Sequence, residues 1–163
     1  MTDMNRRGVI ASAATAALAA AFGRAGQAFA APTGAYPVSH TPAQWRALLK
    51  PEAYRVLREQ GTETAYTSPL LNEHRRGVFA CAGCDQAAFA SSTKYDSHTG
   101  WPSFWTVLPH ATGSTQDRSL FMSRTEVHCS RCGGHLGHVF DDGPRPTGLR
   151  YCMNGAALTF HAA

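Results

Sequence analysis

Three absences limit what this chain can be. It lacks an uncharged apolar run of the roughly 20 residues that cross a bilayer, because the candidate from Val9 to Phe22 is short and rich in alanine. It lacks an internal repeat beyond two Cys-x-x-Cys motifs, and 163 residues leave no room for a second sizeable domain. It also lacks a large excess of positive charge, so nucleic-acid binding gets little support. We expect one domain without a membrane span and without nucleic acid.

The first 30 residues predict a cleavable export signal. Arg6 and Arg7 precede the alanine-rich run, and Ala-Phe-Ala at positions 28–30 is typical of a signal-peptidase site. The paired arginines resemble a twin-arginine signal, but the usual Phe-Leu is missing, so the general secretory route stays open. Cleavage removes three of 15 basic and one of 11 acidic residues, which leaves a net charge of +2. We expect residues 31–40 to be a linker and the domain at 41–163 to be periplasmic in a Gram-negative bacterium.

The five cysteines fall into two pairs and one single residue. Cys81 and Cys84 form one Cys-x-x-Cys motif, Cys129 and Cys132 form the other, and Cys152 stands alone. Two such turns can bring four sulfur ligands around one structural zinc ion. The pairs are far apart in the sequence, so the hairpins that carry them must meet in space, where zinc would join one edge of a β-sheet.

Other uses of the paired cysteines stay open. In an oxidising compartment they could form two disulfides, and they could also be free thiols in the core. A mixed site with His135 or His138 is a smaller rival, since it would leave the first pair without a purpose. A twin-arginine route would favour zinc, because its cargo folds before export and could take up the metal while reduced.

The pattern of apolar residues predicts two short helices followed by strands. Thr41 suits an N-cap with Pro42 behind it, and Trp45, Leu48 and Leu49 fall on one face. A second helix begins at Pro51 and has Gly61 as its stop signal. The expected strands are Gly77–Ala80, Phe89–Ser91, Ser119–Met122, Glu126–His128, Leu136–Phe140 and Leu149–Phe160, the last with a possible break at Gly155.

The residues around Cys152 make it a candidate reactive thiol. In a strand, Arg150, Cys152 and Asn154 point to one face. The guanidinium would favour the thiolate through its charge, and the amide could donate a hydrogen bond to it. The alternative is a small buried hydrophobic residue between polar neighbours.

Two other segments supply groups that suit a reactive thiol. His135 and His138 lie in a glycine-rich segment followed by Asp141 and Asp142, which combines proton donors with carboxylates that can fix a tautomer. Trp101 lies in a Gly-Trp-Pro turn, where an indole can form the wall of a pocket for a methyl group. Each residue taken alone would more often be an ordinary core or surface residue.

From about Thr41 to Phe160 the chain resembles the methionine sulfoxide reductase B family, the peptide-methionine (R)-S-oxide reductases. The resemblance is carried by ordered motifs: Trp45, Tyr54-Arg55-Val56-Leu57-Arg58-Glu59, Gly61-Thr62-Glu63, Cys81-Ala82-Gly83-Cys84, Lys94-Tyr95-Asp96-Ser97, Gly100-Trp101-Pro102-Ser103-Phe104, Cys129, Cys132, Gly134-His135-Leu136-Gly137-His138-Val139-Phe140, Asp142-Gly143-Pro144 and Arg150-Tyr151-Cys152-Met153-Asn154.

The resemblance implies a mainly β fold, in which twisted antiparallel sheets form a barrel-like core with short N-terminal helices. It implies one structural zinc held by the four paired cysteines. Cys152 would attack the sulfur of the R epimer of methionine sulfoxide in oxidised proteins, releasing methionine and leaving a sulfenic acid. The resemblance further implies roles for the remaining site residues: His135 and His138 as proton donors, Asp142, Arg150 and Asn154 as organisers of charge and water, and Trp101 as the contact for the methyl group.

One position departs from the family. Many members place a resolving cysteine directly before the Gly-Trp-Pro turn, where this chain has Thr99. We therefore expect a single-cysteine cycle in which an external thiol reductant such as thioredoxin reduces Cys152 directly. We expect a monomer. The rival functions are a zinc-ribbon binding module without a reactive Cys152 and a thiol-disulfide exchange protein that uses a Cys-x-x-Cys motif.

Overall fold

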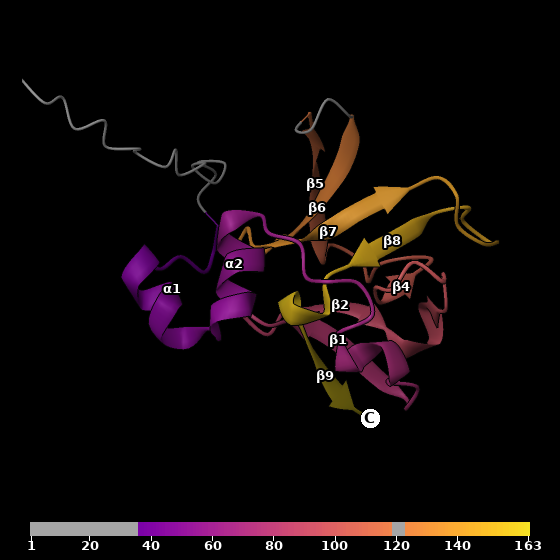
Figure 1. Cartoon of the computed structure of the whole chain (residues 1–163), viewed down its shortest axis with the longest axis horizontal. Coiled ribbons are helices and arrows are strands. Elements are labelled where there is room, and N and C mark those ends of the chain that lie inside the picture. The colour runs from indigo at the N-terminus through magenta and orange to yellow at the C-terminus, as the bar shows by residue number, and fades with distance from the viewer. Residues whose placement is uncertain (1–35, 119–122) are drawn as a thin grey trace, which may run out of the picture.

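The computed structural model describes residues 36–118 and 123–163 (Figure 1). The predicted export signal at 1–30, the first part of the predicted linker and the expected strand Ser119–Met122 lie outside the described residues. Within these two ranges, no helix has the length and apolar character needed to cross a membrane. The prediction of a mainly β protein with two short N-terminal helices is confirmed.

Both helices begin where local chemistry predicts, but Gln60, and not the expected Gly61, takes the left-handed conformation that ends the second. α1 spans Pro42–Leu48 and α2 spans Pro51–Glu59. Thr41 caps α1 in a reciprocal pair: its hydroxyl accepts from the N–H of Gln44, and the Gln44 side chain accepts from the N–H of Thr41. α2 ends as Gln60 adopts a left-handed conformation with φ 54°.

The expected apolar face of α1 is only partly correct. Trp45 is buried, with the Arg58 guanidinium 4.8 Å from its ring and the edge of His40 against it. Leu48 is 62% exposed, which contradicts its predicted place beside Trp45. The helix ends at Leu48 and the chain becomes extended at Leu49, so the final turn has no following turn to cover it.

Nine strands form two antiparallel sheets within the described ranges (Figure 1). The smaller sheet has the order β2-β1-β9, with β2 at Ala87–Ala90, β1 at Gly77–Cys81 and β9 at Leu158–Ala162. The larger sheet has the order β3-β4-β8-β7-β6-β5, with bounds Lys94–Tyr95, Ser103–Phe104, Arg150–Met153, His135–Phe140, Arg124–Cys129 and Thr112–Asp117. Both sheets are open, so the strands described here do not close a barrel.

The long predicted strand at 149–160 is two strands that belong to different sheets. β8 joins the six-stranded sheet and β9 joins the three-stranded sheet. A 3-10 turn at Gly155–Ala157 separates them, which confirms the predicted break at Gly155. Two further 3-10 turns lie within the described residues, η1 at Pro69–Asn72 and η2 at Ser91–Thr93.

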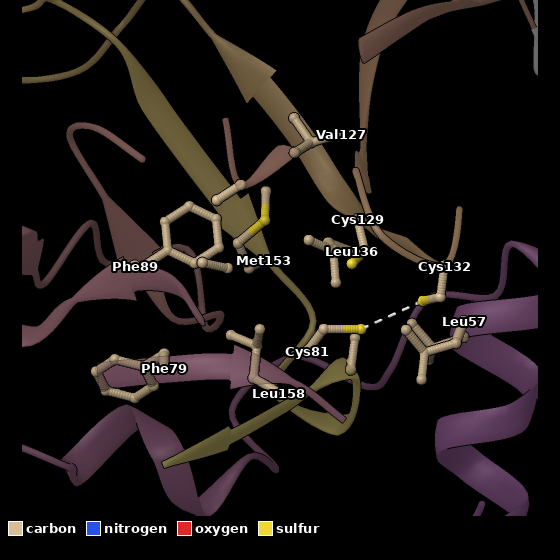
Figure 2. Close-up of a cluster of buried hydrophobic side chains, with 14 of the residues drawn as sticks. Leu57, Phe79, Cys81, Phe89, Val127, Cys129, Cys132, Leu136, Met153 and Leu158 are labelled. Atoms are coloured by element: carbon tan, nitrogen blue, oxygen red, sulfur yellow. Dashed lines mark hydrogen bonds between the residues drawn. The ribbon is translucent and has the colours of Figure 1, made fainter. Parts of the chain in front are cut away.

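Aromatic rings and the cysteine cluster fill the space between the sheets (Figure 2). Phe89 stacks on Phe104 with centroids 4.4 Å apart, and Phe79 meets Phe104 edge-on at 5.0 Å. All three rings are fully buried, and each contributes about 1.5–3 kcal/mol of hydrophobic free energy. Leu57 of α2 packs at the cysteine end of this core, so the helices close the sheet edge where the cysteines lie.

Candidate functional site

The two Cys-x-x-Cys motifs meet in space, as predicted. Cys81 ends β1 and Cys129 ends β6, and each strand turns so that its second cysteine, Cys84 or Cys132, folds back. In both turns the N–H of the first cysteine donates to a carbonyl five residues ahead, that of Gln86 or Gly134, at 2.9 Å. The four sulfurs lie within 4.8 Å of one another and could hold a metal ion.

The spacing and protonation of these sulfurs fit tetrahedral thiolate coordination. The Cys81–Cys132 and Cys84–Cys129 sulfurs are 3.7 and 3.5 Å apart. Zinc–sulfur bonds of about 2.3 Å place tetrahedral sulfurs about 3.8 Å apart. Hydrogen bonds among the sulfurs raise the pKa of the Cys81 and Cys132 thiols and lower that of the Cys84 and Cys129 thiols. Four thiolates this close repel one another, so they need a cation among them. All five cysteines are free thiols, which does not support the disulfide alternative.

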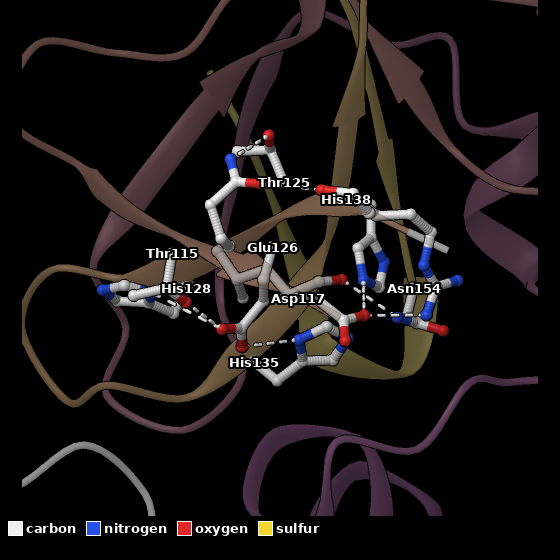
Figure 3. Close-up of polar contacts among 12 residues, drawn as sticks. Thr115, Asp117, Thr125, Glu126, His128, His135, His138 and Asn154 are labelled. Carbon is white, nitrogen blue, oxygen red and sulfur yellow. Dashed lines mark hydrogen bonds and ion pairs between the residues drawn. The ribbon is translucent and has the colours of Figure 1, made fainter. Parts of the chain in front are cut away.

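The histidines of the glycine-rich segment bind carboxylates instead of joining the sulfurs (Figure 3). His135 Nδ1 lies 2.8 Å from Glu126 Oε1, and His138 Nε2 lies 2.9 Å from Asp117 Oδ2. Neither belongs to the group of potential metal ligands, so the mixed site is not supported. Sequence reasoning expected carboxylates from Asp141 and Asp142 but did not find these partners.

A β-bulge explains how two histidines three positions apart share one face. In the β6–β7 ladder, Val127 pairs with Gly137 but His128 pairs with His135, so Leu136 is the extra residue. At the bulge the Leu136 side chain points into the core, where it is fully buried. The rings of His135 and His138 then lie 5.3 Å apart. Strict alternation along an unbroken strand would have separated them.

Cys152 lies in the middle of the larger sheet, next to His138. On β8 it pairs with His138 of β7 and with Ser103 of β4. A Cβ on Gly137 would lie 2.1 Å from the Cys152 carbonyl oxygen, so only glycine allows this approach of the two strands. Cys152 is half-buried, and its sulfur is 3.8 Å from the Thr99 hydroxyl.

A small pocket of about 120 Å³ opens beside Cys152. Four of the predicted site residues line this pocket: Trp101, His138, Cys152 and Asn154. Thr62, Arg124, Gly137 and Phe140 complete its lining. The structure thus brings the indole, one imidazole, the thiol and the amide together, while His135 lies behind His138 and outside the lining.

Glu63 fastens the pocket from a distant part of the chain. Its backbone N–H donates to Asn154 Oδ1 at 2.9 Å, and its carbonyl accepts from Trp101 Nε1 at 3.2 Å. Its buried carboxylate accepts from the N–H groups of Gly155 and Ala156. Burial raises the pKa of Glu63 although these two hydrogen bonds oppose it. Asn154 also donates to the Leu136 carbonyl at 3.1 Å, so its amide is held on both sides.

Arg150 and Asp142, both predicted site residues, form a pair at the rim. The guanidinium donates two hydrogen bonds of 2.8 and 2.7 Å to the Asp142 carboxylate and lies 4.3 Å from the Phe140 ring. The Arg150 hydrogen bond lowers the pKa of Asp142. Arg150 does not line the pocket. Its hydrogen bond to Asp142, first, and the charge of Cys152 on the same strand raise the pKa of its guanidinium.

The environment of His138 favours a neutral imidazole. Burial lowers its pKa below the ordinary 6.5, and the nearby Arg124 guanidinium adds to the effect. The Asp117 carboxylate opposes both, since its Oδ2 accepts from His138 and also from Arg124 at 2.7 Å. The opposite balance holds for Glu126, where burial raises the pKa but hydrogen bonds from His135 and Thr115 prevail and lower it.

Asp117, Glu126 and Glu63 are site residues that sequence reasoning missed. Asp117 ends β5, whose polar sequence Thr-Gly-Ser-Thr-Gln-Asp has no apolar alternation to announce a strand. Glu126 was placed in a strand, but nothing in its neighbours points to His135. Glu63 did belong to the Gly61-Thr62-Glu63 motif that carried the family resemblance, and that motif was the available signal.

Comparisons with known proteins place these residues in a described family. The SelR domain matches residues 49–162. The chain is 57% identical over 122 residues to the peptide methionine sulfoxide reductase MsrB of Thiobacillus denitrificans, covering 74% of this chain and 92% of that protein. It is 51% identical over 126 residues to the protein of that name from Leptospira interrogans, covering 77% and 96%. The crystal structure of the Mis18 'Yippee-like' domain aligns with 55% of this chain and 98% of its own, at 20% identity and a TM-score of 0.45.

Proposed function

The chain belongs to the methionine sulfoxide reductase B family, as the resemblance implied, and we propose that it repairs oxidised proteins by reducing the R epimer of methionine sulfoxide. The observation that carries this proposal is the pocket in which Cys152, His138, Asn154 and Trp101 meet. The relatives that share about half of its residues are named peptide methionine sulfoxide reductases. A pocket of about 120 Å³ suits the methyl sulfoxide end of one side chain better than a whole metabolite.

The proposed reaction balances in two half-reactions. The Cys152 thiol gives up its proton and its sulfur takes the oxygen of the sulfoxide, so that a thiol and a sulfoxide become a sulfenic acid and a thioether. The methionine sulfur gains two electrons and the Cys152 sulfur loses two. An external dithiol then reduces the sulfenic acid to the thiol, releasing water and a disulfide.

We propose His138 as the group that protonates the sulfoxide oxygen. A protonated oxygen makes the sulfoxide sulfur electrophilic, so a nucleophile without an acid beside it would be ineffective. His138 lines the pocket and is the cross-strand neighbour of Cys152, whereas His135 lies behind it against Glu126. Asn154, held by Glu63 and Leu136, would orient the substrate oxygen, and Trp101 would contact the methyl group.

We propose zinc as the ion at the four cysteines, with a structural role. When bound, it would neutralise the thiolates and join the turn after β1 to the turn after β6. Cys84 is the half-exposed member of the quartet, and the other three are buried. This arrangement supports a closed structural site that leaves no ligand position for substrate.

A stereospecific assay on residues 31–163 tests the function. Purified protein, free dabsyl-methionine sulfoxide epimers and peptides containing each epimer are incubated with dithiothreitol, and zinc is measured in the same sample. We expect reduction of the R epimer only, faster in peptides, with one zinc per chain. Equal rates for the two epimers, or no reduction by a zinc-loaded protein, would reject the assignment.

A second experiment tests the single-cysteine cycle. One turnover without reductant is followed by trapping with dimedone and mass spectrometry. We expect an adduct on Cys152, because Thr99 stands beside it where another thiol would be needed. An internal disulfide that includes Cys152 would overturn the single-cysteine cycle and leave the reductase assignment unchanged.

We further propose that residues 1–30 export the protein to the periplasm and that thioredoxin-like proteins reduce it there. The paired arginines and the Ala-Phe-Ala sequence support export. Fractionation of cells that express the full chain with a C-terminal tag tests this. We expect processed protein in the periplasm and unprocessed protein in the cytoplasm after Arg6→Lys with Arg7→Lys. Processing that is indifferent to these changes would favour the general secretory route.

A further inference from the structure

Three hydroxyl groups form a row that ends on the sulfur of Cys152. The Thr99 hydroxyl is 3.8 Å from Cys152 Sγ and 2.8 Å from the Ser97 hydroxyl. Ser97 is in turn 2.7 Å from the Ser103 hydroxyl. Ser103, fully buried on β4, donates to the carbonyl of Trp101 at 3.1 Å. The row therefore has four contacts between a thiol at one end and a carbonyl at the other.

The loop that carries Ser97 and Thr99 is fixed from outside. His98 and Gly100 both have positive φ, 57° and 90°. The Tyr66 hydroxyl donates to the His98 carbonyl at 2.7 Å, and the Tyr66 N–H donates to the Gly100 carbonyl at 2.8 Å. Ser103 is held by strand pairing directly opposite Cys152. The positions of the three hydroxyls are thus fixed by the anchored loop that carries Ser97 and Thr99 and by the strand that carries Ser103.

The carbonyl at the far end decides the direction of every hydrogen bond. A carbonyl only accepts, so Ser103 uses its single hydrogen on Trp101 and must accept from Ser97. Ser97 then has no hydrogen left and accepts from Thr99. Thr99 in turn can only accept from the Cys152 thiol. Four contacts are satisfied by four hydrogens, three from hydroxyls and one from sulfur.

We infer that Ser97, Thr99 and Ser103 are positioning residues that couple the protonation of Cys152 to the direction of this hydroxyl row. When the thiol loses its proton, three hydrogens remain for four contacts. Each hydroxyl rotates about its C–O bond, so that Thr99 donates to the thiolate, Ser97 to Thr99 and Ser103 to Ser97. The Trp101 carbonyl gives up its donor. The thiol proton passes to a base in the solvent, and each of the three hydroxyls keeps its own hydrogen.

This reversal replaces the weak bond from the thiol to Thr99 by a strong bond from Thr99 to the thiolate, and it also breaks the bond from Ser103 to the Trp101 carbonyl. A hydroxyl that donates to an anion forms a charge-assisted hydrogen bond, about twice as strong as the neutral one it replaces. The neutral bond to the Trp101 carbonyl is lost in exchange. The row therefore stabilises the thiolate form of Cys152. The inference relies on the proposed function only for the role of Cys152 as nucleophile.

The charged and titratable groups that face Cys152 stay the same in the variants that test this. They are Arg150 on β8, His138 on β7, Arg124 on β6 and Tyr95 on β3, with Asp142 and Asp117 as their partners. None of the three hydroxyl residues contacts the four paired cysteines. A change in the pH at which Cys152 reacts can then be assigned to the row itself.

The test measures the rate of iodoacetamide alkylation of Cys152 against pH in zinc-loaded protein, with Cys152→Ala as the mass control. Thr99→Val keeps the shape and removes the hydroxyl, so the thiolate loses its donor. We expect the midpoint of the profile to rise by about one pH unit. Thr99→Ser keeps the hydroxyl and should restore the native midpoint.

Ser103→Ala should shift the midpoint in the opposite direction, and a merely structural role of these residues would not produce such a reversal. Without Ser103, the Ser97 hydrogen is free to turn to Thr99, and the Thr99 hydrogen to the sulfur, before the thiol ionises. We expect the midpoint to fall by about half a pH unit. Unchanged midpoints, or a rise in both Thr99→Val and Ser103→Ala, would overturn the inference. Because no sulfoxide is present, this outcome is separate from a failure of the reductase assay.

Discussion

The quartet of cysteines and the single cysteine show how neighbours decide the chemistry of one atom type. Each sulfur of the quartet follows a strand into a tight turn and meets other sulfurs within 4.8 Å. Cys152 lies in the middle of a strand, where its neighbours are a hydroxyl, an imidazole and a pocket. The cysteine quartet can bind a cation and leaves no room for substrate. The environment of Cys152 leaves one thiol accessible, beside groups that can move a proton.

The largest effect is expected when the quartet is broken. Cys129→Ser removes one thiolate, and because binding of structural zinc is part of the folding free energy, we expect loss of zinc and destabilisation by several kcal/mol. Metal content and thermal melting measure both. Ser130→Ala is the matched control one residue away, since it removes only an exposed hydroxyl bonded to His110. A fully metallated Cys129→Ser protein with native stability would contradict the ligand set.

The reverse separation is expected at the other site. Cys152→Ser should lower the rate of sulfoxide reduction at least about 1,000-fold, because a hydroxyl is a far poorer nucleophile than a thiol at neutral pH. Zinc content and the melting temperature should stay at the native values. Residual turnover within tenfold of the native enzyme would remove Cys152 from the mechanism and break the division between the two sites.

Asp117→Asn sharpens the comparison within the pocket. The carboxylate opposes the effects of burial and Arg124, so its removal should move the pKa of His138 further below 6.5. We expect about a tenfold loss in kcat/KM at pH 7, since less of the imidazole can deliver a proton. NMR titration of His138 measures the shift.

Asp85→Asn provides the matched control for that variant. Asp85 forms a pair with His161 of similar length, 2.7 Å, on the exposed surface. Its removal leaves the pocket untouched, so kcat/KM should be native. Equal losses in the two variants would mean that the effect of Asp117 is not specific to the pocket.

The smallest expected effect is in the dependence of stability on pH. Burial and Arg124 depress the pKa of His138 in the folded state, so the unfolded chain binds more protons once the pH falls below about 6.5. Stability should therefore decline as pH falls through this value and level off below the folded pKa. Melting temperatures between pH 8 and 5 should show a decline of a few degrees that is smaller in His138→Gln. An equal decline in both proteins would assign it elsewhere.

Local chemistry made the starts of the helices and the meeting of the cysteine pairs predictable. Thr41 and Pro42 mark the start of a helix, and two Cys-x-x-Cys turns have one efficient arrangement. The prediction that Leu48 is buried was wrong. Whether the last turn of a two-turn helix is buried depends on what covers it, and the periodicity of apolar residues does not show this. Gly155 indicated that the 149–160 segment is broken into two strands. It did not indicate that the two strands belong to different sheets.

The partners of the site were less predictable than its reactive groups. Cys152, His138, Asn154 and Trp101 stand in recognisable motifs, and the structure brings them to one pocket. Asp117 and Glu126 reach the histidines only because of a bulge at Leu136 and a polar strand at the sheet edge. Such contacts depend on register, and a register is a property of the folded ladder instead of any single segment.

The long-range hydrogen bonds of Glu63 also have a consequence for synthesis of the chain. Its bonds reach residues 91 to 93 positions further along the chain, to Asn154, Gly155 and Ala156. A ribosome that has delivered the indole and both imidazoles has still not delivered the partners that hold Glu63 and, through it, Trp101. The pocket should therefore form only after Asn154, Gly155 and Ala156 have been synthesised.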